Sequence, residues 1–257
     1  MAVVVLRREE VGRVLDAMDG AQPHEAPLRI ELDALAGLID HTCLRPDARR
    51  EDMVKLAEEA KQWKTATACV HPGWVPLARS LLHGTGVKTA TVVGFPFGAT
   101  TTRVKRCEAE AAILAGAEEL DMVLNIGALK SGEYERLEAD IRGVVEISKP
   151  SGVLLKVILE TAYLTDDEKV EACRRAERAG ADFVKTSTGF APTGATAADV
   201  RLMCSAVGPG IGVKAAGGIR TLDAALGMLR AGASRLGTTS TVSILEEAQR
   251  RLTPARA

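Results

Sequence analysis

Aromatic side chains are scarce in this chain of 257 residues, since Phe, Trp and Tyr together make up 3% of it. So few rings leave little surface on which nucleic acid bases could stack, and a net charge of −1 offers no basic face for a polyanion. Hydrophobic residues nonetheless make up 46% of the chain, which suits one large globular domain with a sizeable core. We therefore expect no nucleic acid partner.

Long apolar runs are also missing. The opening run, residues 1–6, ends at Arg7 and is too short for the core of a signal peptide or for a membrane span. No other run in the sequence reaches the length of a membrane span. We expect a cytoplasmic protein with no membrane partner.

Sequence patterns typical of disulfides, metals and nucleotides are absent as well. The five cysteines are odd in number and include no Cys-x-x-Cys pair, which favours a reducing compartment. The four histidines form no His-x-x-x-His and no Cys/His pair at a metal-ligand spacing. Neither Gly-x-Gly-x-x-Gly nor a Walker sequence occurs. We expect neither a metal nor a cofactor.

What the chain does contain is a regular alternation of short apolar runs and helical patterns. A capping box at 165–168 marks one helix start, and Ala-Gly-Ala phrases at 115–117, 179–181 and 231–233 mark helix ends followed by strands. The predicted strands are 37–40, 65–70, 88–95, 119–125, 153–160, 182–188, 212–216 and 234–238. Eight βα units in about 230 residues favour a single (β/α)8 TIM barrel. A doubly wound open sheet is the alternative, but its glycine-rich first turn is not seen.

The N-terminal part does not fit this alternation. Residues 11–18 have the pattern of a short helix, and the Pro-containing segment 22–27 is typical of a linker. We therefore expect an N-terminal extension over 1–28 and a barrel domain over 29–257.

Lys185 and Lys214 lie in two of the predicted strands, each just before a Gly- or Thr-rich turn. Burying an ammonium group is costly, and a lysine whose pKa is lowered in this way can attack a carbonyl carbon. Counting by twos places Asp121, Lys156, Lys185 and Lys214 on inward faces, if these are the inner faces of a barrel. Two alternatives remain: each lysine holds its ammonium in water, or the four form a purely structural ion-pair network.

Other polar residues occupy predicted strand ends. Asp40 is interpreted either as a ligand for a substrate hydroxyl or as a helix cap, and Cys69 as a buried thiol by default. The turns 216–219 and 237–240 follow the seventh and eighth strands, where barrels often bind phosphate. We expect Gly217, Gly218, Thr239 and Ser240 to form an anion-binding site there.

An ordered set of motifs resembles the deoxyribose-phosphate aldolase family, which are class I aldolases of the barrel type. The motifs span most of the barrel: Leu38-Ile-Asp-His-Thr42, Val92-Val-Gly-Phe-Pro-Phe-Gly98, Glu119-Leu-Asp-Met-Val123, Leu155-Lys-Val-Ile-Leu-Glu-Thr161, Val184-Lys-Thr-Ser-Thr-Gly189 and Val213-Lys-Ala-Ala-Gly-Gly-Ile-Arg220. The resemblance implies reversible cleavage of 2-deoxy-D-ribose 5-phosphate to D-glyceraldehyde 3-phosphate and acetaldehyde. It places the Schiff base on Lys185, a second lysine at Lys214, a relay aspartate at Asp121 and a further site lysine at Lys156.

The same motifs suggest which residues contact the substrate. We expect Asp40, Thr42, Cys69, Lys156, Thr188 and Gly189 to do so, together with the residues of the two turns. The chain departs from the family at Phe190, where some members carry a lysine, at Thr239 in the eighth-strand turn, and in lacking a C-terminal tyrosine. A homodimer or larger homo-oligomer is expected.

Two other functions stay open. One is a barrel isomerase or synthase that holds a sugar phosphate without forming an imine, and the other is a barrel that binds sugar phosphates without catalysis. Borohydride trapping with substrate separates the aldolase from both, because only an imine is reduced to a stable adduct.

Overall fold

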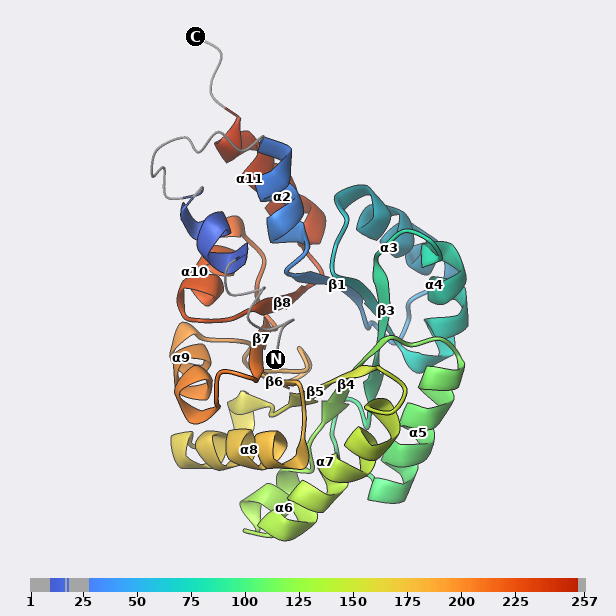
Figure 1. Cartoon of the computed structure of the whole chain (residues 1–257), viewed down its shortest axis with the longest axis vertical. Coiled ribbons are helices and arrows are strands. Elements are labelled where there is room, and N and C mark those ends of the chain that lie inside the picture. The colour runs from blue at the N-terminus through green and yellow to red at the C-terminus, as the bar shows by residue number, and fades with distance from the viewer. Residues whose placement is uncertain (1–9, 17, 19–27, 254–257) are drawn as a thin grey trace.

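The computed structural model describes residues 10–16, 18 and 28–253. In this part of the chain eight parallel strands close into a barrel in sequence order, with helices around the outside (Figure 1). The predicted (β/α)8 barrel is therefore confirmed. The strands are β1 Ile39–Cys43, β2 Thr67–Val70, β3 Lys88–Val93, β4 Glu119–Val123, β5 Leu154–Ile158, β6 Phe183–Lys185, β7 Gly212–Ala216 and β8 Arg235–Thr238.

Helices follow the strands, and short 3₁₀ helices, η1 and η2, precede α4 and α8. The elements are α2 Leu28–Ala36, α3 Arg50–Trp63, η1 Pro72–Trp74, α4 Val75–Leu82, α5 Thr102–Leu114, α6 Ile126–Lys130, α7 Tyr134–Ser148, η2 Thr161–Tyr163, α8 Asp166–Ala179, α9 Ala197–Ala206, α10 Leu222–Arg230 and α11 Thr241–Leu252. The capping box between Thr165 and Glu168 is present at the start of α8. Gly116, Gly180 and Gly232 have φ values of 105°, 95° and 109°, the left-handed conformation that ends a helix.

The N-terminal part contributes to the core. Residues 10–16 form a helix, and Val11 and Val14 are buried within the main hydrophobic cluster. This helix matches most of the segment predicted at 11–18, while the predicted linker at 22–27 lies outside the described residues. The domain boundary at residue 28 stays a prediction.

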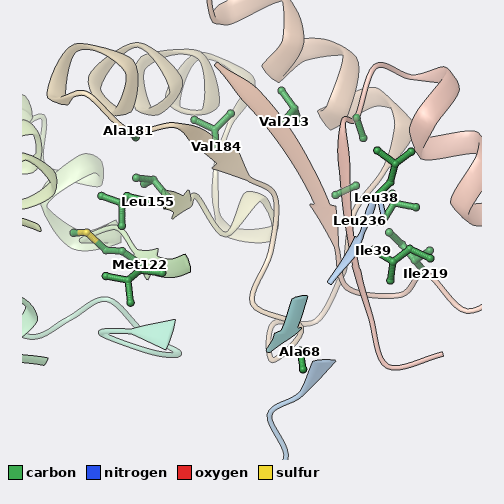
Figure 2. Close-up of a cluster of buried hydrophobic side chains, with 14 of the residues drawn as sticks. Leu38, Ile39, Ala68, Met122, Leu155, Ala181, Val184, Val213, Ile219 and Leu236 are labelled. Atoms are coloured by element: carbon green, nitrogen blue, oxygen red, sulfur yellow. The ribbon is translucent and has the colours of Figure 1, made fainter. Parts of the chain in front are cut away.

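The strands carry two different faces. Figure 2 shows Leu155, Val184, Val213 and Leu236 among the buried apolar side chains, and these belong to the cluster that includes the surrounding helices. Side chains alternate along a strand, so the residues next to these four in the sequence point into the barrel. Those inward residues are Lys156, Lys185, Lys214 and Arg235, all buried. The apolar layer outside the strands therefore encloses a charged interior.

The outward face of α5 differs from what its sequence repeat suggests. Val104, Cys107, Ala111 and Leu114 recur at helical spacing, and the helix is present, but Val104 is 50% and Leu114 83% exposed. The buried residues of α5 are instead Lys105, Ala109 and Ala112. Lys105 can be buried because its Nζ donates to the Val123 carbonyl at 2.9 Å and to Asp140 at 2.6 Å. A paired lysine and small alanines thus replace the apolar stripe on the packed side.

Gly212, at the start of β7, tests how tightly the barrel interior is packed. A Cβ at this position would lie 2.1 Å from Cε1 of the buried Phe183, whereas a Cβ at Gly227 in α10 would meet no described atom within 4 Å. We expect Gly212→Ala to lower the free energy of unfolding by about 1–3 kcal/mol through overpacking. The control Gly227→Ala should raise it by ~0.5–1 kcal/mol, because alanine favours a helix. Denaturant unfolding measures both, and equal effects would contradict the packing argument.

Candidate active site

Asp121 of β4 binds three lysines in the barrel interior. Its Oδ1 accepts a hydrogen bond from Lys156 Nζ at 2.9 Å. Its Oδ2 accepts from Lys185 and Lys214, each at 2.7 Å. All four side chains are buried, and each comes from a different one of the neighbouring strands β4 to β7. The structure therefore brings together the four residues that the period-two count placed inside.

The pKa values of the two lysines that share Oδ2 are shifted in opposite directions. Burial and the nearby Lys214 ammonium lower the pKa of Lys185, although Asp121 opposes this. Burial also acts on Lys214, but Asp121 and Asp40 outweigh it and raise the pKa of Lys214 above its ordinary value. Burial opposes ionisation of Asp121 too, yet the three lysines hold its pKa well below the usual value. Lys185 is therefore the lysine that most readily becomes a neutral amine, beside a Lys214 that stays charged.

A second layer of charges lies on the same inward faces. Arg235 Nη1 donates to Asp40 Oδ1 at 2.6 Å and to Glu119 Oε2 at 3.0 Å, and Lys156 Nζ lies 2.6 Å from Glu119 Oε2. Asp40 also lies 2.5 Å from Lys214 Nζ through its Oδ2. Asp40 is the second residue of β1 rather than the last residue of a strand, so it belongs to this interior layer and caps no helix.

Glu119 and Arg235 are the members of this layer that the sequence reasoning missed. The signal was available: Glu119 precedes Asp121 by two residues and so shares its face, and Arg235 pairs with Lys214 across β7 and β8. A prediction based on the carboxyl ends of strands does not reach them, because both residues begin their strands.

Thr188 and Gly189 lie in the turn after β6. The backbone N–H of Thr188 donates to both carboxylate oxygens of Glu160 at 3.3 Å, and its hydroxyl donates to Glu160 as well. Glu160 lies beyond the end of β5, with φ 59° in the left-handed region. Phe190 packs edge-on against Phe95, with ring centroids 5.3 Å apart. These contacts hold the turn at the carboxyl end of the barrel.

The two turns predicted to bind an anion lie side by side. Gly217 and Gly218 have φ values of 85° and 78°, and the Thr238 hydroxyl donates to the Ile219 carbonyl at 2.6 Å, which links β8 to the β7–α10 turn. Thr239 is exposed and Ser240 half-buried, immediately before α11. The free backbone N–H groups of a helix N-terminus attract anions, so this arrangement suits a phosphate.

Cys69 and Thr42 occupy different environments. Cys69 is buried beside Leu44, Ala90 and Val92, and burial together with the Asp121 charge raises the pKa of its thiol to about 11. A thiol of this kind is not a nucleophile at neutral pH. Thr42 is half-buried, and its hydroxyl donates to the Asp40 carbonyl at 2.9 Å.

The part of the chain that the structure describes contains neither a cluster of metal ligands nor a membrane-spanning helix. No group of three or more His, Cys, Asp or Glu side chains there is arranged to hold a metal ion. None of the described helices combines the length and the hydrophobicity needed to cross a lipid bilayer.

Comparison with known proteins agrees with this geometry. The family model described as DeoC/LacD family aldolase matches residues 35–244. The deoxyribose-phosphate aldolase of Bacillus subtilis is 55% identical over 213 residues, which are 83% of this chain and 95% of that protein. The enzyme of the same name from Thermococcus gammatolerans is 54% identical over 217 residues, 84% of this chain and 96% of that protein.

A solved structure is similar over nearly its whole length. The tetrameric deoxyribose phosphate aldolase from Aeropyrum pernix superposes with a TM-score of 0.81 and 35% identity, covering 93% of this chain and 97% of that one. The family model spans most of the barrel, and the relatives exceed half identity over more than four-fifths of the chain. The chain therefore belongs to the DeoC/LacD family of aldolases.

Proposed function

We propose that this chain is a class I aldolase that reversibly cleaves 2-deoxy-D-ribose 5-phosphate to D-glyceraldehyde 3-phosphate and acetaldehyde through an imine on Lys185. The names of its relatives supply the substrate. The observation that carries the mechanism is the pair Lys185 and Lys214 on one oxygen of Asp121, because the lysine whose pKa is lowered lies beside a lysine whose pKa is raised.

The first step is attack on the aldehyde of the open-chain sugar. The lone pair of Lys185 Nζ adds to C1, and the carbinolamine loses water to give a protonated imine. Lys214 starts as an ammonium and donates a proton to the departing hydroxyl, which leaves as water, so that Lys214 becomes a neutral amine; its Nζ meets the same carboxylate oxygen as Lys185. The buried interior disfavours the charged form of Lys185, and this keeps the amine available for attack.

The second step breaks the C2–C3 bond. The C3 hydroxyl gives its proton to the Lys214 amine and becomes the aldehyde of glyceraldehyde 3-phosphate, while the electrons of the C2–C3 bond move into the imine and form an enamine. Asp121 remains ionised, so it is a poor base by itself, but its Oδ2 connects the two lysines and can pass protons between them. Protonation of the enamine at C2 and hydrolysis of the imine then release acetaldehyde and restore Lys185.

The remaining contacts position the substrate. Gly217, Gly218, Thr239 and Ser240 would bind the phosphate, and Thr188 and Gly189 would line the approach to Lys185. Ser187 follows Lys185 by two residues, and its hydroxyl is buried and meets no hydrogen-bond partner among the described residues, so it is available to a sugar hydroxyl.

The assembly and the compartment are proposed on separate grounds. A homo-oligomer is supported by the tetramer named for the Aeropyrum pernix structure. A reducing compartment such as the cytoplasm is supported by the five cysteines, none of which forms a disulfide in the part of the chain that the structure describes.

Replacing Lys185 tests the proposed function directly. Lys185→Met keeps the apolar stem and removes the amine, so we expect retro-aldol activity and borohydride-trapped adduct both to disappear while the circular dichroism spectrum is preserved. Peptide mapping of the adduct in the unaltered protein should identify Lys185. An adduct on Lys156 or Lys214 would overturn the assignment.

Replacing Lys214 tests its electrostatic role. Two ammonium groups about 4 Å apart repel by roughly 4 kcal/mol at an effective dielectric near 20, or about three pKa units. Without Lys214 the pKa of Lys185 should rise, so in Lys214→Leu the acidic limb of imine formation moves to higher pH. We expect kcat at pH 7 to fall by ~100-fold or more and to recover partly at alkaline pH. A folded variant whose limb does not move would show that Lys214 acts by proton transfer alone.

Gly218 offers a matched pair of substitutions for the phosphate site. A Cβ at Gly218 would meet no described atom within 4 Å, although the positive φ strains any side chain there. Asn and Asp share that strain and nearly the same shape, so only the charge separates them. Gly218→Asp should raise KM for the phosphorylated sugar ~10-fold or more above Gly218→Asn, with little difference for unphosphorylated deoxyribose. An equal difference for both sugars would place the phosphate elsewhere.

A further inference from the structure

The charges inside the barrel do not balance if every group is ionised. Among the described residues, the inward faces of the strands carry four basic side chains and three acidic ones, all buried. The bases are Lys156, Lys185, Lys214 and Arg235, and the acids are Asp40, Glu119 and Asp121. A buried surplus charge is costly, so the interior is most stable when one of the four bases has lost its proton. Arginine does not lose its proton in proteins, so the base that has lost its proton must be a lysine.

The contacts decide which lysine it is. Lys156 lies 2.6 Å from Glu119, 2.9 Å from Asp121 and 3.8 Å from Asp40. Lys214 lies 2.5 Å from Asp40 and 2.7 Å from Asp121. Lys185, among the described residues, forms an ion pair with Asp121 alone, at 2.7 Å. The lysine with the fewest acidic partners gains least from its charge, and that lysine is Lys185.

Glu119 and Arg235 belong to the same set of charges but do not contact Lys185. Arg235 contacts Asp40 and Glu119 and stacks over Phe183, with its guanidinium carbon 5.6 Å from the ring centroid. Glu119 joins Arg235 to Lys156, which leads on to Asp121. Neither residue touches Lys185 in this network, so any influence on the amine must pass through charge rather than contact.

The other groups around Lys185 and around this pair leave the count unchanged. Cys69 faces Lys185 from β2 with a neutral thiol, since its pKa is raised to about 11. Glu160 acts electrostatically on Lys185, but it lies beyond the end of β5 rather than on an inward strand face. The N–H and hydroxyl of Thr188 bind its carboxylate and burial raises its pKa, so it is not counted with the acids of the strands. Lys88 approaches Glu119 to 3.9 Å, but its side chain is half exposed and hydrated. Lys105 and Asp140 form a separate pair on α5 and α7.

We propose that Glu119 and Arg235 are positioning residues that fix the charge of the barrel interior and so make Lys185 the lysine that lacks a proton. This proposal rests on the proposed function, because it concerns the amine that forms the imine. If the pair serves only to hold β1, β4 and β8 together, its loss lowers stability but leaves the pH dependence of imine formation where it is.

Two single substitutions and their combination test this charge count. Glu119→Gln removes an acid, so Lys185 should lose its proton more readily and the acidic limb should move to lower pH. Arg235→Met removes a base and leaves three acids with three lysines, so Lys185 should hold its proton and the limb should move to higher pH. A charge about 10 Å away at an effective dielectric near 20 shifts a pKa by roughly one unit, which sets the expected size of each movement. The double variant restores the surplus of one, and its limb should return to within about 0.3 pH unit of the original.

The measurement is the pH dependence of the rate at which borohydride traps acetaldehyde on Lys185, mapped by peptide mass. Replacement of a whole buried ion pair by neutral groups is usually tolerated, so the double variant can be compared with whichever single variant folds. Asp140→Asn is the matched control, because it leaves Lys105, a buried lysine outside the barrel, without its acidic partner, and the acidic limb of this variant should not move. A shift in each single variant, opposite in direction between the two, together with an unshifted limb in the double, supports the proposal. Unmoved limbs in the singles, shifts in the same direction, or a double variant displaced by a full unit overturn it. Absence of trapping at Lys185 in the unaltered protein would instead contradict the proposed function.

Discussion

The sharing of one carboxylate by three lysines is the constraint on which the rest of this structure depends. Asp121 is fully buried, and three lysines could not be buried around it without its negative charge. The surrounding packing leaves room for these long side chains. A Cβ at Gly237 would lie 3.0 Å from Cε of Lys214, so a glycine at this position of the eighth strand leaves room for the lysine side chain. The backbone of the barrel is thus shaped around its charges.

An interior of this kind is a poor way to gain stability. Removing seven charged groups from water costs several kcal/mol for each ion, and apolar side chains of similar volume usually serve a core at least as well. The stability of the barrel comes instead from the other face of the strands, where Leu155, Val184, Val213 and Leu236 pack in the main hydrophobic cluster. A fold that separates its two faces in this way can maintain a reactive interior, because the apolar layer offsets the cost of the charged one. We regard this separation as the reason why the chemistry sits on the strands.

The sequence was sufficient for the fold because each strand is short and followed by a recognisable turn or helix start. It was also sufficient for the inward placement of Asp121, Lys156, Lys185 and Lys214, since alternation along a strand has a fixed period of two. It was less informative wherever a long side chain reaches beyond its own element. The buried side of α5 contains Lys105, which no hydrophobic pattern predicts, because its burial depends on Asp140 from another helix. Glu160 leaves the strand in a left-handed conformation that its residue type disfavours, and its partner Thr188 is 28 positions away.

The rim and the interior of the barrel obey different physical rules. At the rim the candidate phosphate turns use backbone N–H groups and positive φ values at Gly217 and Gly218, so neighbouring side chains such as Phe190 and Thr239 can differ from those of relatives without disturbing the anion site. In the interior every charge contacts another, and a change at Glu119 or Arg235 alters the balance felt at Lys185 even where no contact is lost. Variation in substrate recognition is therefore tolerated at the loops, whereas the reactivity of the amine is a property of the whole charged set. It follows that Lys185 cannot be understood from its own neighbours alone: its neutrality is what remains after three acids have been distributed over four bases.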